Sequence, residues 1–324
     1  MQNKSNFALN ASSIGYTLGY KKNKFYPLNP NPKNIKSIIS SLHKLGLSGI
    51  EFPYFRFFKT KNELQNLNKH LIKNQVFCVV DGDKPLDLVE IKKLIIVAKT
   101  LNSKIIRVKG SNILSSERWK KKNWNKYIEI LIKKLKNLKK ILIKNDLKIA
   151  IENHQDFDSE ELKYIVNKAG KNIVGINFDI GNALASCEDP LEFAMKNKNN
   201  IINVHIKDYK IGSSRNGILL SRCPIGSGNV NIKKVLKYLN INCPNIAYSI
   251  ELGALDNREI LGNKYFFWQT FKFNVNKKKL FFYKMKKKAK KLKKIPWEKK
   301  LKPSDIVKYE LRELRKSISY LSSI

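Results

Sequence analysis

The chain has 324 residues, of which 42% are hydrophobic and 10% are aromatic, enough for one large α/β domain or for two ordinary domains. No run approaches the ~18 apolar residues of a membrane span, and residues 1–19 lack the basic start and apolar core of a secretory leader. The four cysteines lie far apart without a CxxC pair, which predicts reduced thiols in a cytoplasmic protein rather than a disulfide frame or a zinc ribbon.

The net charge of +38 is the most unusual feature of the composition, and it has two interpretations. A chain this basic suggests nucleic acid or an anionic membrane as a partner. However, lysine far outnumbers arginine, and lysine, asparagine and isoleucine share A/T-rich codons, so genome bias also explains the charge. We favour the second interpretation for residues 1–255, because their lysines lie mostly where a helix would face solvent. We therefore expect weak, salt-sensitive DNA binding, no specific nucleic-acid partner and no membrane partner.

In the first half of the chain, apolar runs typical of strands alternate with helical periodicities. Strands are predicted at residues 7–15, 49–52, 76–83 and 104–110. Helices are predicted at residues 35–45, 64–72, 91–98 and 127–142, the last being the clearest amphipathic helix of the chain. Gly46 is placed to end the first helix.

The alternation continues in the second half. Strands are predicted at residues 149–154, 174–179, 201–205 and 247–251, and helices around 162–166, 190–195 and 232–239. The composition of residues 209–230 predicts a long loop. Eight strand candidates separated by helices indicate a parallel α/β sheet.

After Glu251 the alternation stops. We treat residues 256–303 as a basic insertion between strand 8 and helix 8 of a single domain that covers residues 1–324. Helix 8 is predicted from about residue 304 to 321, with Ser304 as its cap. The lysine-rich run 284–294 is either a patch for an anionic ligand or a solvated, partly disordered helix, and we favour the helix.

Four consecutive strands of the second half end on a side chain that can bind a metal ion: Glu152, Asp179, His205 and Glu251. The first two intervals are 27 and 26 residues, near the ~30 residues of one strand–helix unit in an eight-stranded barrel. The third interval is 46 residues, which the loop at 209–230 explains. Because the carboxyl ends of barrel strands meet at one mouth, we predict an α/β fold of the (β/α)₈ TIM barrel type, with an insertion before the last helix.

Two glutamates, an aspartate and a histidine form a hard ligand set for one divalent ion, with Mn²⁺ first and Mg²⁺, Co²⁺ or Zn²⁺ able to compete. Such an ion can chelate adjacent sugar oxygens and stabilise the enediolate that forms when the neighbouring carbon loses its proton. We assign Glu152 and Glu251 as general base and acid as well as metal ligands. Any one of the four residues could be structural, so the prediction depends on their occurrence on four consecutive strands.

Other polar residues near the strand ends are candidates for substrate contacts. His154 lies two residues beyond Glu152 and would face the same side of the strand, as a substrate ligand or as support for the metal ligands. Lys207 shares its parity with His205 and could neutralise an enediolate or a substrate anion. Glu51 could reach substrate hydroxyls, although a loop cap explains it equally well.

Five motifs resemble the xylose-isomerase-like TIM barrel superfamily of sugar isomerases and epimerases in order and spacing over about residues 7–255. They are Ile151-Glu152-Asn153-His154, Phe178-Asp179-Ile180-Gly181-Asn182, Val204-His205-Ile206-Lys207-Asp208-Tyr209, the glycine-rich residues 224–230, and Ile250-Glu251-Leu252-Gly253. Residues 251–258 and Trp268 also resemble a branch described as sugar phosphate isomerase/epimerase. In tagatose-epimerase-like members the matching four residues bind the metal and the two glutamates exchange the proton, so the resemblance implies these roles here.

Two departures from the family pattern concern the substrate. Many relatives have a substrate-contacting histidine three residues after the aspartate, where this chain has Asn182. Many also have an acidic residue in the glycine-rich loop, where this chain has Ser227 and Asn229. We therefore expect an intact metal site with Asn182 among the substrate-binding residues, and we leave open which sugar is bound and whether it is phosphorylated.

The leading hypothesis is a sugar isomerase or epimerase of carbohydrate metabolism, acting on a small sugar or polyol. The alternative is an inosose-dehydratase-like lyase acting on a cyclic polyol or keto acid, since the same barrel and metal support elimination after enolisation. An endonuclease-IV-like repair nuclease would fit the charge, but it needs many histidines, and this chain has four, of which His43 and His70 fall on predicted helices. A barrel without catalysis and a homo-oligomeric state also stay open.

Overall fold

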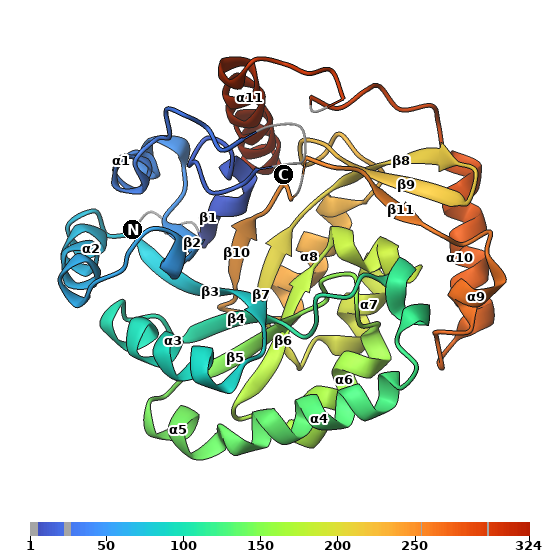
Figure 1. The fold of residues 1–324 in the computed structure, drawn as a ribbon, viewed down its shortest axis with the longest axis horizontal. Coiled ribbons are helices and arrows are strands. Elements are labelled where there is room, and N and C mark those ends of the chain that lie inside the picture. The colour runs from blue at the N-terminus through green and yellow to red at the C-terminus, as the bar shows by residue number, and fades with distance from the viewer. Residues whose placement is uncertain (1–5, 23–26, 254, 297) are drawn as a thin grey trace.

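The computed structural model describes residues 6–22, 27–253, 255–296 and 298–324. Eight parallel strands close into a barrel surrounded by helices (Figure 1). The strands are β1 (Phe7–Asn10), β2 (Gly49–Pro53), β3 (Phe77–Pro85), β4 (Ile105–Lys109), β5 (Lys148–Glu152), β6 (Val174–Asp179), β7 (Ile201–Ile206) and β10 (Ala247–Ile250). Their order around the barrel is β1-β10-β7-β6-β5-β4-β3-β2, so each strand lies beside its neighbours in chain order. The predicted (β/α)₈ TIM barrel is confirmed.

The helices between the strands lie where the apolar periodicity predicted them. They are α1 (Ile35–Ser41), α2 (Lys61–Lys73), α3 (Leu88–Thr100), α4 (Trp124–Asn137), α5 (Lys139–Lys144), α6 (Ser159–Ala169), α7 (Pro190–Asn197) and α8 (Ile232–Asn242). Gly46 adopts the left-handed conformation with φ of 74° at the end of the first helical segment, as expected of a glycine just past a helix. Thr60 and Glu63 cap α2 reciprocally, and Asp158 and Glu161 do the same for α6.

The helix predicted over residues 127–142 is divided in two. α4 ends at Asn137 and α5 begins at Lys139, with a bend at Leu138. Leu135, Leu138 and Leu142 are all buried on the two sides of this bend. The bend thus keeps the apolar face of this long segment in contact with the curved barrel. A straight helix would diverge from the barrel surface.

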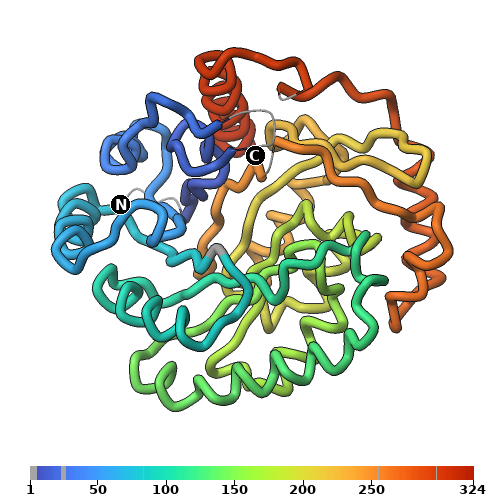
Figure 2. The backbone as a smooth tube through the Cα atoms, viewed as in Figure 1, coloured from blue at the N-terminus to red at the C-terminus, as the bar shows by residue number. Residues whose placement is uncertain are grey.

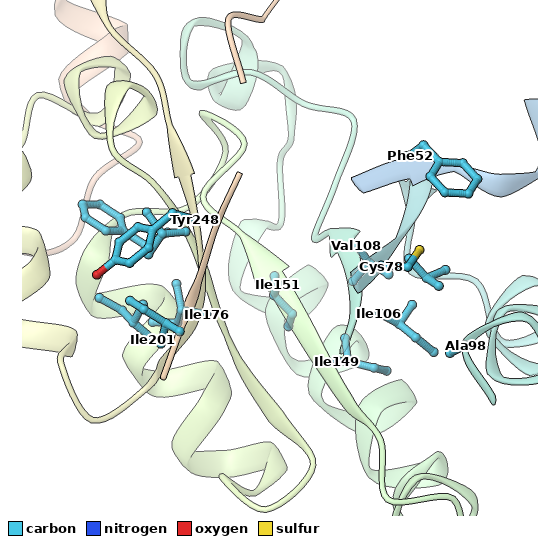
Figure 3. Packing of buried hydrophobic residues seen from close by; sticks show 14 of the residues in the cluster. Phe52, Cys78, Ala98, Ile106, Val108, Ile149, Ile151, Ile176, Ile201 and Tyr248 are labelled. Atoms are coloured by element: carbon cyan, nitrogen blue, oxygen red, sulfur yellow. The ribbon is translucent and has the colours of Figure 1, made fainter. Parts of the chain in front are cut away.

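The strands separate apolar from polar residues by their alternation. In β4 and β5, Ile106, Val108, Ile149 and Ile151 belong to the main apolar core (Figure 3). The residues between them point to the opposite side, which is the barrel interior. That interior holds charged side chains, so the sequence alternation that builds the core also places the polar residues inside the barrel.

Residues 209–230, which we expected to form a loop, contain a hairpin instead. β8 (Tyr209–Ser214) pairs antiparallel with β9 (Gly217–Arg222), and β11 (Arg258–Ile260) pairs with β9 to complete a three-stranded sheet. The hairpin is stable because it buries Ile211, Ile218 and Leu220 in a second apolar cluster. The polar turn residues of this segment obscured that burial in the sequence.

The insertion packs its own helices on this sheet (Figure 1). α9 (Tyr265–Trp268) and α10 (Val275–Lys288) contribute Phe267, Trp268 and Phe282 to the second cluster. The lysine-rich run 284–294 begins in α10 but continues as an extended segment, with Lys290 bridging to Gly212. The helix expected over the whole run therefore covers only its first part.

The last helix, α11 (Pro303–Leu321), returns to the start of the barrel (Figure 2). Glu310 accepts hydrogen bonds from the backbone of Tyr16 and Thr17 just after β1. The prediction of Ser304 as the cap is wrong, because the helix already begins at Pro303 and Lys302 precedes it. Proline has no N–H to satisfy, so it begins the helix without a side-chain cap.

None of the described helices is both long and apolar enough to cross a bilayer.

Candidate metal centre and active site

The residues at the carboxyl ends of β5, β6, β7 and β10 converge on one point in the barrel. One ligand atom from each of Glu152, Asp179, His205 and Glu251 lies within 4.8 Å of the others, and all four residues are buried. The strand register explains the convergence, because Asp179 lies opposite His205 in the β6–β7 pair. Ser249, two residues before Glu251, lies opposite His205 on the other side. The structure thus brings together the whole predicted ligand set.

Two polar atoms of this cluster lack hydrogen-bond partners, as expected of metal ligands. His205 Nδ1 and Glu251 Oε2 are 2.8 Å apart and buried, yet neither makes a hydrogen bond of acceptable geometry. Glu251 Oε2 also lies 3.1 Å from Lys207 Nζ, and a cation bound between Glu251 and His205 would give His205 Nδ1 the partner that it lacks. Three carboxylates and one imidazole also suit a hard divalent ion. The residues present therefore fit a single divalent ion.

Glu51, which we expected to contact substrate, lies behind His205. Its side chain is fully buried, with Oε1 2.7 Å from His205 Nε2 and Oε2 accepting a hydrogen bond of 2.6 Å from Ser249 Oγ. A carboxylate on the far nitrogen of a histidine fixes the ring orientation and tautomer, which here leaves Nδ1 facing the cluster. Glu51 is not among the residues that line the cavity described below. We interpret it as a positioning residue for His205.

Arg107 is a residue of this site that the sequence motifs did not reveal. Its guanidinium lies 2.6 Å from Asp81 Oδ1 and contacts Glu152 Oε2. Asp81 and Arg107 are direct neighbours in the β3–β4 register, so the pair is built into the barrel. A signal existed in the sequence, since an arginine inside the apolar run 105–108 must find a buried carboxylate partner.

Lys207 points into the same interior, as its shared parity with His205 predicted. Its Nζ lies 2.5 Å from Asp179 Oδ2 and 3.1 Å from Glu251 Oε2. Burial lowers the pKa of Lys207, but the two carboxylates outweigh burial and raise that pKa above its ordinary value. Lys207 is therefore a permanent positive charge beside two of the candidate ligands.

The paired charges also shift the titration of the ligands themselves. Burial lowers the pKa of His205, but Glu51 and Glu251 outweigh it and raise the pKa to about 9. Burial raises the pKa of Asp179 to about 6, although Lys207 opposes the rise. Without a metal ion, His205 is therefore protonated at neutral pH and must lose that proton to become a ligand.

A cavity of about 230 Å³ reaches this cluster from the surface. Four predicted site residues line it: His154, Asn182, Lys207 and Glu251. Glu152, Asp179 and His205 are fully buried and lie deeper. Glu251 is thus the glutamate of the ligand set that a substrate in the cavity would meet directly.

Neutral polar side chains form one wall of the cavity. Asn182 Nδ2 donates to Glu152 Oε1 over 3.1 Å, and Asn182 Oδ1 accepts from Gln155 Nε2 at 3.1 Å and from the Tyr209 hydroxyl at 3.2 Å. Gln155 and Tyr209 were not predicted as site residues, although Tyr209 ends one of the five family motifs. Amide and hydroxyl groups held in such a network can bind sugar hydroxyls without a charge.

His154 also faces this cavity. Its Nδ1 is buried and has no hydrogen-bond partner among the described residues. Burial, assisted by Lys109 and Arg107, lowers the pKa of His154 well below the usual value for histidine. A neutral imidazole results, which can donate to or accept from a substrate hydroxyl at neutral pH.

The other two histidines lie away from the barrel mouth. His43 is in a short helical turn, with its Nε2 2.6 Å from the carbonyl oxygen of Asn74, and His70 in α2 bonds to the carbonyl oxygen of Lys36. Neither belongs to the ligand cluster. A three-metal site rich in histidine is thus not assembled by the described histidines.

Residues 39–259 match the sequence profile of the xylose isomerase-like TIM barrel. The chain belongs to this family. The match covers β2 to β10 and all four residues of the ligand cluster. Family membership and the barrel agree with the resemblance noted in the motifs.

One related protein matches a short part of this chain. The uncharacterized protein YihM of Escherichia coli K12 is 30% identical over 93 residues, which cover 29% of this chain and 28% of that protein. The match therefore spans less than a third of the relative's length.

Two solved structures share the fold over most of their length. A D-tagatose 3-epimerase-like protein has a TM-score of 0.56 and 18% identity, with 96% of this chain and 99% of that chain covered. A xylose isomerase-like TIM barrel protein from Mycobacterium smegmatis, in complex with magnesium, has a TM-score of 0.58 and 13% identity, with 87% and 97% covered. At these identities the two structures show the fold alone.

Proposed function

We propose that this protein is a divalent-metal-dependent sugar isomerase or epimerase that works by proton transfer next to a carbonyl. The observation that carries the proposal is the convergence of Glu152, Asp179, His205 and Glu251 at the floor of a small polar cavity. Membership of the xylose isomerase-like family supports the reaction class. The cavity is smaller than the ~300–1,000 Å³ clefts of drug-sized ligands, which favours a substrate of monosaccharide size.

These four residues would hold one divalent ion, with Mn²⁺ as our first choice and Mg²⁺, Co²⁺ and Zn²⁺ as competitors. When bound, the ion supplies Lewis-acid stabilisation of negative charge on the substrate oxygens. Glu51 holds His205 in the orientation that this ligand role requires.

Glu251 is the residue we assign to proton removal. It reaches the cavity, its carboxylate lies 3.1 Å from Lys207, and Lys207 and His205 outweigh burial to hold its pKa well below the usual value. It is therefore ionised and able to accept a proton at neutral pH. Lys207 then provides a positive charge beside the oxygen that becomes negative.

We assign proton return to Glu152, the role that the family resemblance implies, and Glu152 lies deeper than the residues that line the cavity. Arg107 contacts its Oε2 and Asn182 donates to its Oε1, so both oxygens are held in place. His154 and Asn182 face the cavity and would orient substrate hydroxyls. The same site favours a small sugar or polyol as the partner. We also propose a cytoplasmic location, because the four cysteines are free and buried.

The first test is metal content. Elemental mass spectrometry of the protein reconstituted with Mn²⁺ should give about one ion per chain for the wild type and a large loss for His205→Ala. His43→Ala is the matched control, because His43 lies on a helical turn outside the cluster. Wild-type protein that binds no divalent ion would refute the proposed mechanism, and two or three ions per chain would favour a nuclease.

The second test is proton exchange. NMR of ketoses and inososes incubated in D₂O with metal-loaded protein should reveal deuterium on the carbon beside the carbonyl. Retention of all substrate oxygens would support an isomerase or epimerase. Loss of water would support the alternative, a dehydratase of a cyclic polyol or keto acid.

A further inference from the structure

The outer part of the cavity carries positive charge that the proposed proton transfer does not use. Lys21 and Arg258 both line it. Lys21 follows β1 and Arg258 opens β11 shortly after β10, and β1 and β10 are neighbours in the barrel. The two cations therefore reach the cavity from segments that follow neighbouring strands of the barrel.

The charges that line the cavity do not cancel. The basic residues are Lys21, Arg107, Lys109, Lys207 and Arg258, and the acidic residues are Asp81, Glu251 and Asp256, which leaves five positive charges against three negative ones. A bound divalent ion would add to this excess, although the deeper carboxylates of the ligand cluster offset it.

Lys21 and Arg258 differ from the deeper cations in their partners. Arg107 and Lys207 are in ion pairs with carboxylates of the cluster. Lys21 Nζ instead donates to the carbonyl oxygen of Ser12 over 3.1 Å. Among the described residues, neither Lys21 nor Arg258 forms an ion pair with a carboxylate. Glu251 and Glu310 attract the Lys21 ammonium from farther away, but no described carboxylate pairs directly with either cation, so a negatively charged ligand could contact both.

The stem of Lys21 passes close to the backbone of Gly15. A Cβ atom on Gly15 would lie 2.5 Å from Lys21 Cδ, so only glycine at residue 15 lets the lysine stem cross the backbone there. Burial lowers the pKa of Lys21 to about 8, which reflects the cost of keeping an ammonium group in this place. An anion beside it would offset that cost.

We propose that the substrate of this site carries one anionic group, a phosphate ester or a carboxylate, and that Lys21 and Arg258 bind it. This inference rests on the proposed function, since it places the carbon chain of the sugar between that group and Glu251. The size of the cavity favours a monosaccharide derivative over a nucleotide. The net charge of +38 would also speed the encounter with an anionic substrate.

The test compares matched neutral and anionic sugars. Calorimetric titration of Mg²⁺-loaded protein would use D-fructose, D-fructose 6-phosphate and D-fructuronate, and D-tagatose with its 6-phosphate. We expect at least one anionic form to bind about 10- to 100-fold more tightly than its neutral parent, as charge-assisted hydrogen bonds allow. The phosphate and carboxylate arms identify which anion the site prefers. Equal affinity for every neutral and anionic partner would overturn the proposal.

Variants test the two cations directly. Lys21→Met and Arg258→Met should each remove most of the preference for the anionic sugar, so that affinity for the anionic sugar falls far more than affinity for its neutral parent. Lys22→Met and Arg215→Met are matched controls, because both side chains are exposed and neither lines the cavity. Gly15→Ala keeps every charge but displaces the Lys21 stem, so it should weaken anion binding as well. Unchanged anion preference in folded Lys21→Met and Arg258→Met would refute the assignment.

Deuterium uptake separates this inference from the proposed function. An anionic sugar that binds through Lys21 and Arg258 but takes up no deuterium would support the anion site and refute the isomerase or epimerase. A neutral ketose that takes up deuterium, while its phosphate neither binds better nor exchanges, would do the reverse.

Discussion

The barrel mouth and the lysine-rich run 284–294 are both dense in charge, yet they differ in burial. At the mouth, Arg107 and Lys207 are buried and each lies within ion-pair distance of two carboxylates. In the run, all eight lysines are exposed, and the five from residue 288 onward border a wide cleft of about 800 Å³ together with other basic residues. Charge therefore acquires a specific chemical role where burial forces it to pair, and exposed charge chiefly affects solubility and long-range attraction. The predictions below test this difference.

The largest effect should come from Glu251, the carboxylate that connects the buried network with the cavity. Glu251→Gln keeps the size of the side chain but removes the proton acceptor. Deuterium exchange into a substrate should fall by about 10²- to 10⁴-fold. Glu259→Gln is a control in β11 outside the ligand cluster. Exchange that survives in Glu251→Gln would reassign the base.

The second prediction compares two neighbouring lysines of α10. Lys278 is 3% exposed and lies 3.4 Å from Asp158 and 3.3 Å from Glu188, whereas Lys277 is 66% exposed and pairs with Glu192. Lys278→Met leaves two buried carboxylates without their cation and should cost about 3–5 kcal/mol of unfolding free energy. Lys277→Met should cost about 0–1 kcal/mol. Urea denaturation measures both, and equal losses would contradict the comparison.

The third prediction concerns the pH dependence of metal binding. His205 has a pKa raised to about 9 and must lose its proton to bind an ion. Metal affinity should therefore rise about tenfold per pH unit from pH 6 towards 9 and then level off. Below about pH 6 the dependence should steepen, because Asp179, with its pKa raised to about 6, becomes protonated too. Calorimetry in buffers of different ionisation enthalpy counts the released protons. A flat profile between pH 6 and 9 would contradict this account.

The smallest effect on the site should come from the lysine-rich run. Replacing its eight lysines with glutamine lowers the net charge from +38 to +30, that is 38 − 8. We would follow binding to random duplex DNA by fluorescence anisotropy over a salt series. The affinity should fall, and its dependence on salt concentration should become less steep. Metal content and substrate exchange should stay within about twofold of wild type. A loss of exchange would mean that the run contributes to the active site.

The candidate site illustrates what a sequence pattern can and cannot reveal. Glu152, Asp179, His205 and Glu251 each end an apolar run, so topology alone predicts that they meet. The sequence pattern did not reveal Arg107, Lys21 and Arg258, because none of them is the last residue of a predicted strand. Their positions depend on the barrel register and on loops that return from the rim.

The fold shows the same division. The eight strands were predictable, because each is a short apolar run followed by a helical periodicity. The β8–β9 hairpin was not, because its strands are half-polar and bury their apolar residues only in the second cluster, which α9, α10 and β11 help to form. The hairpin can therefore be recognised only in the tertiary structure.

The sequence by itself determined the barrel, the order of its strands and the four side chains at their tips, because strand alternation and local periodicity are properties of neighbouring residues. Only the tertiary structure decided that Glu51 lies behind His205 and that Arg107 contacts Glu152. It also decided that Lys21 and Arg258 line one cavity. These relations join residues far apart in the chain. The contacts of Glu51 and Arg107 arise because barrel closure forces buried charges to find partners.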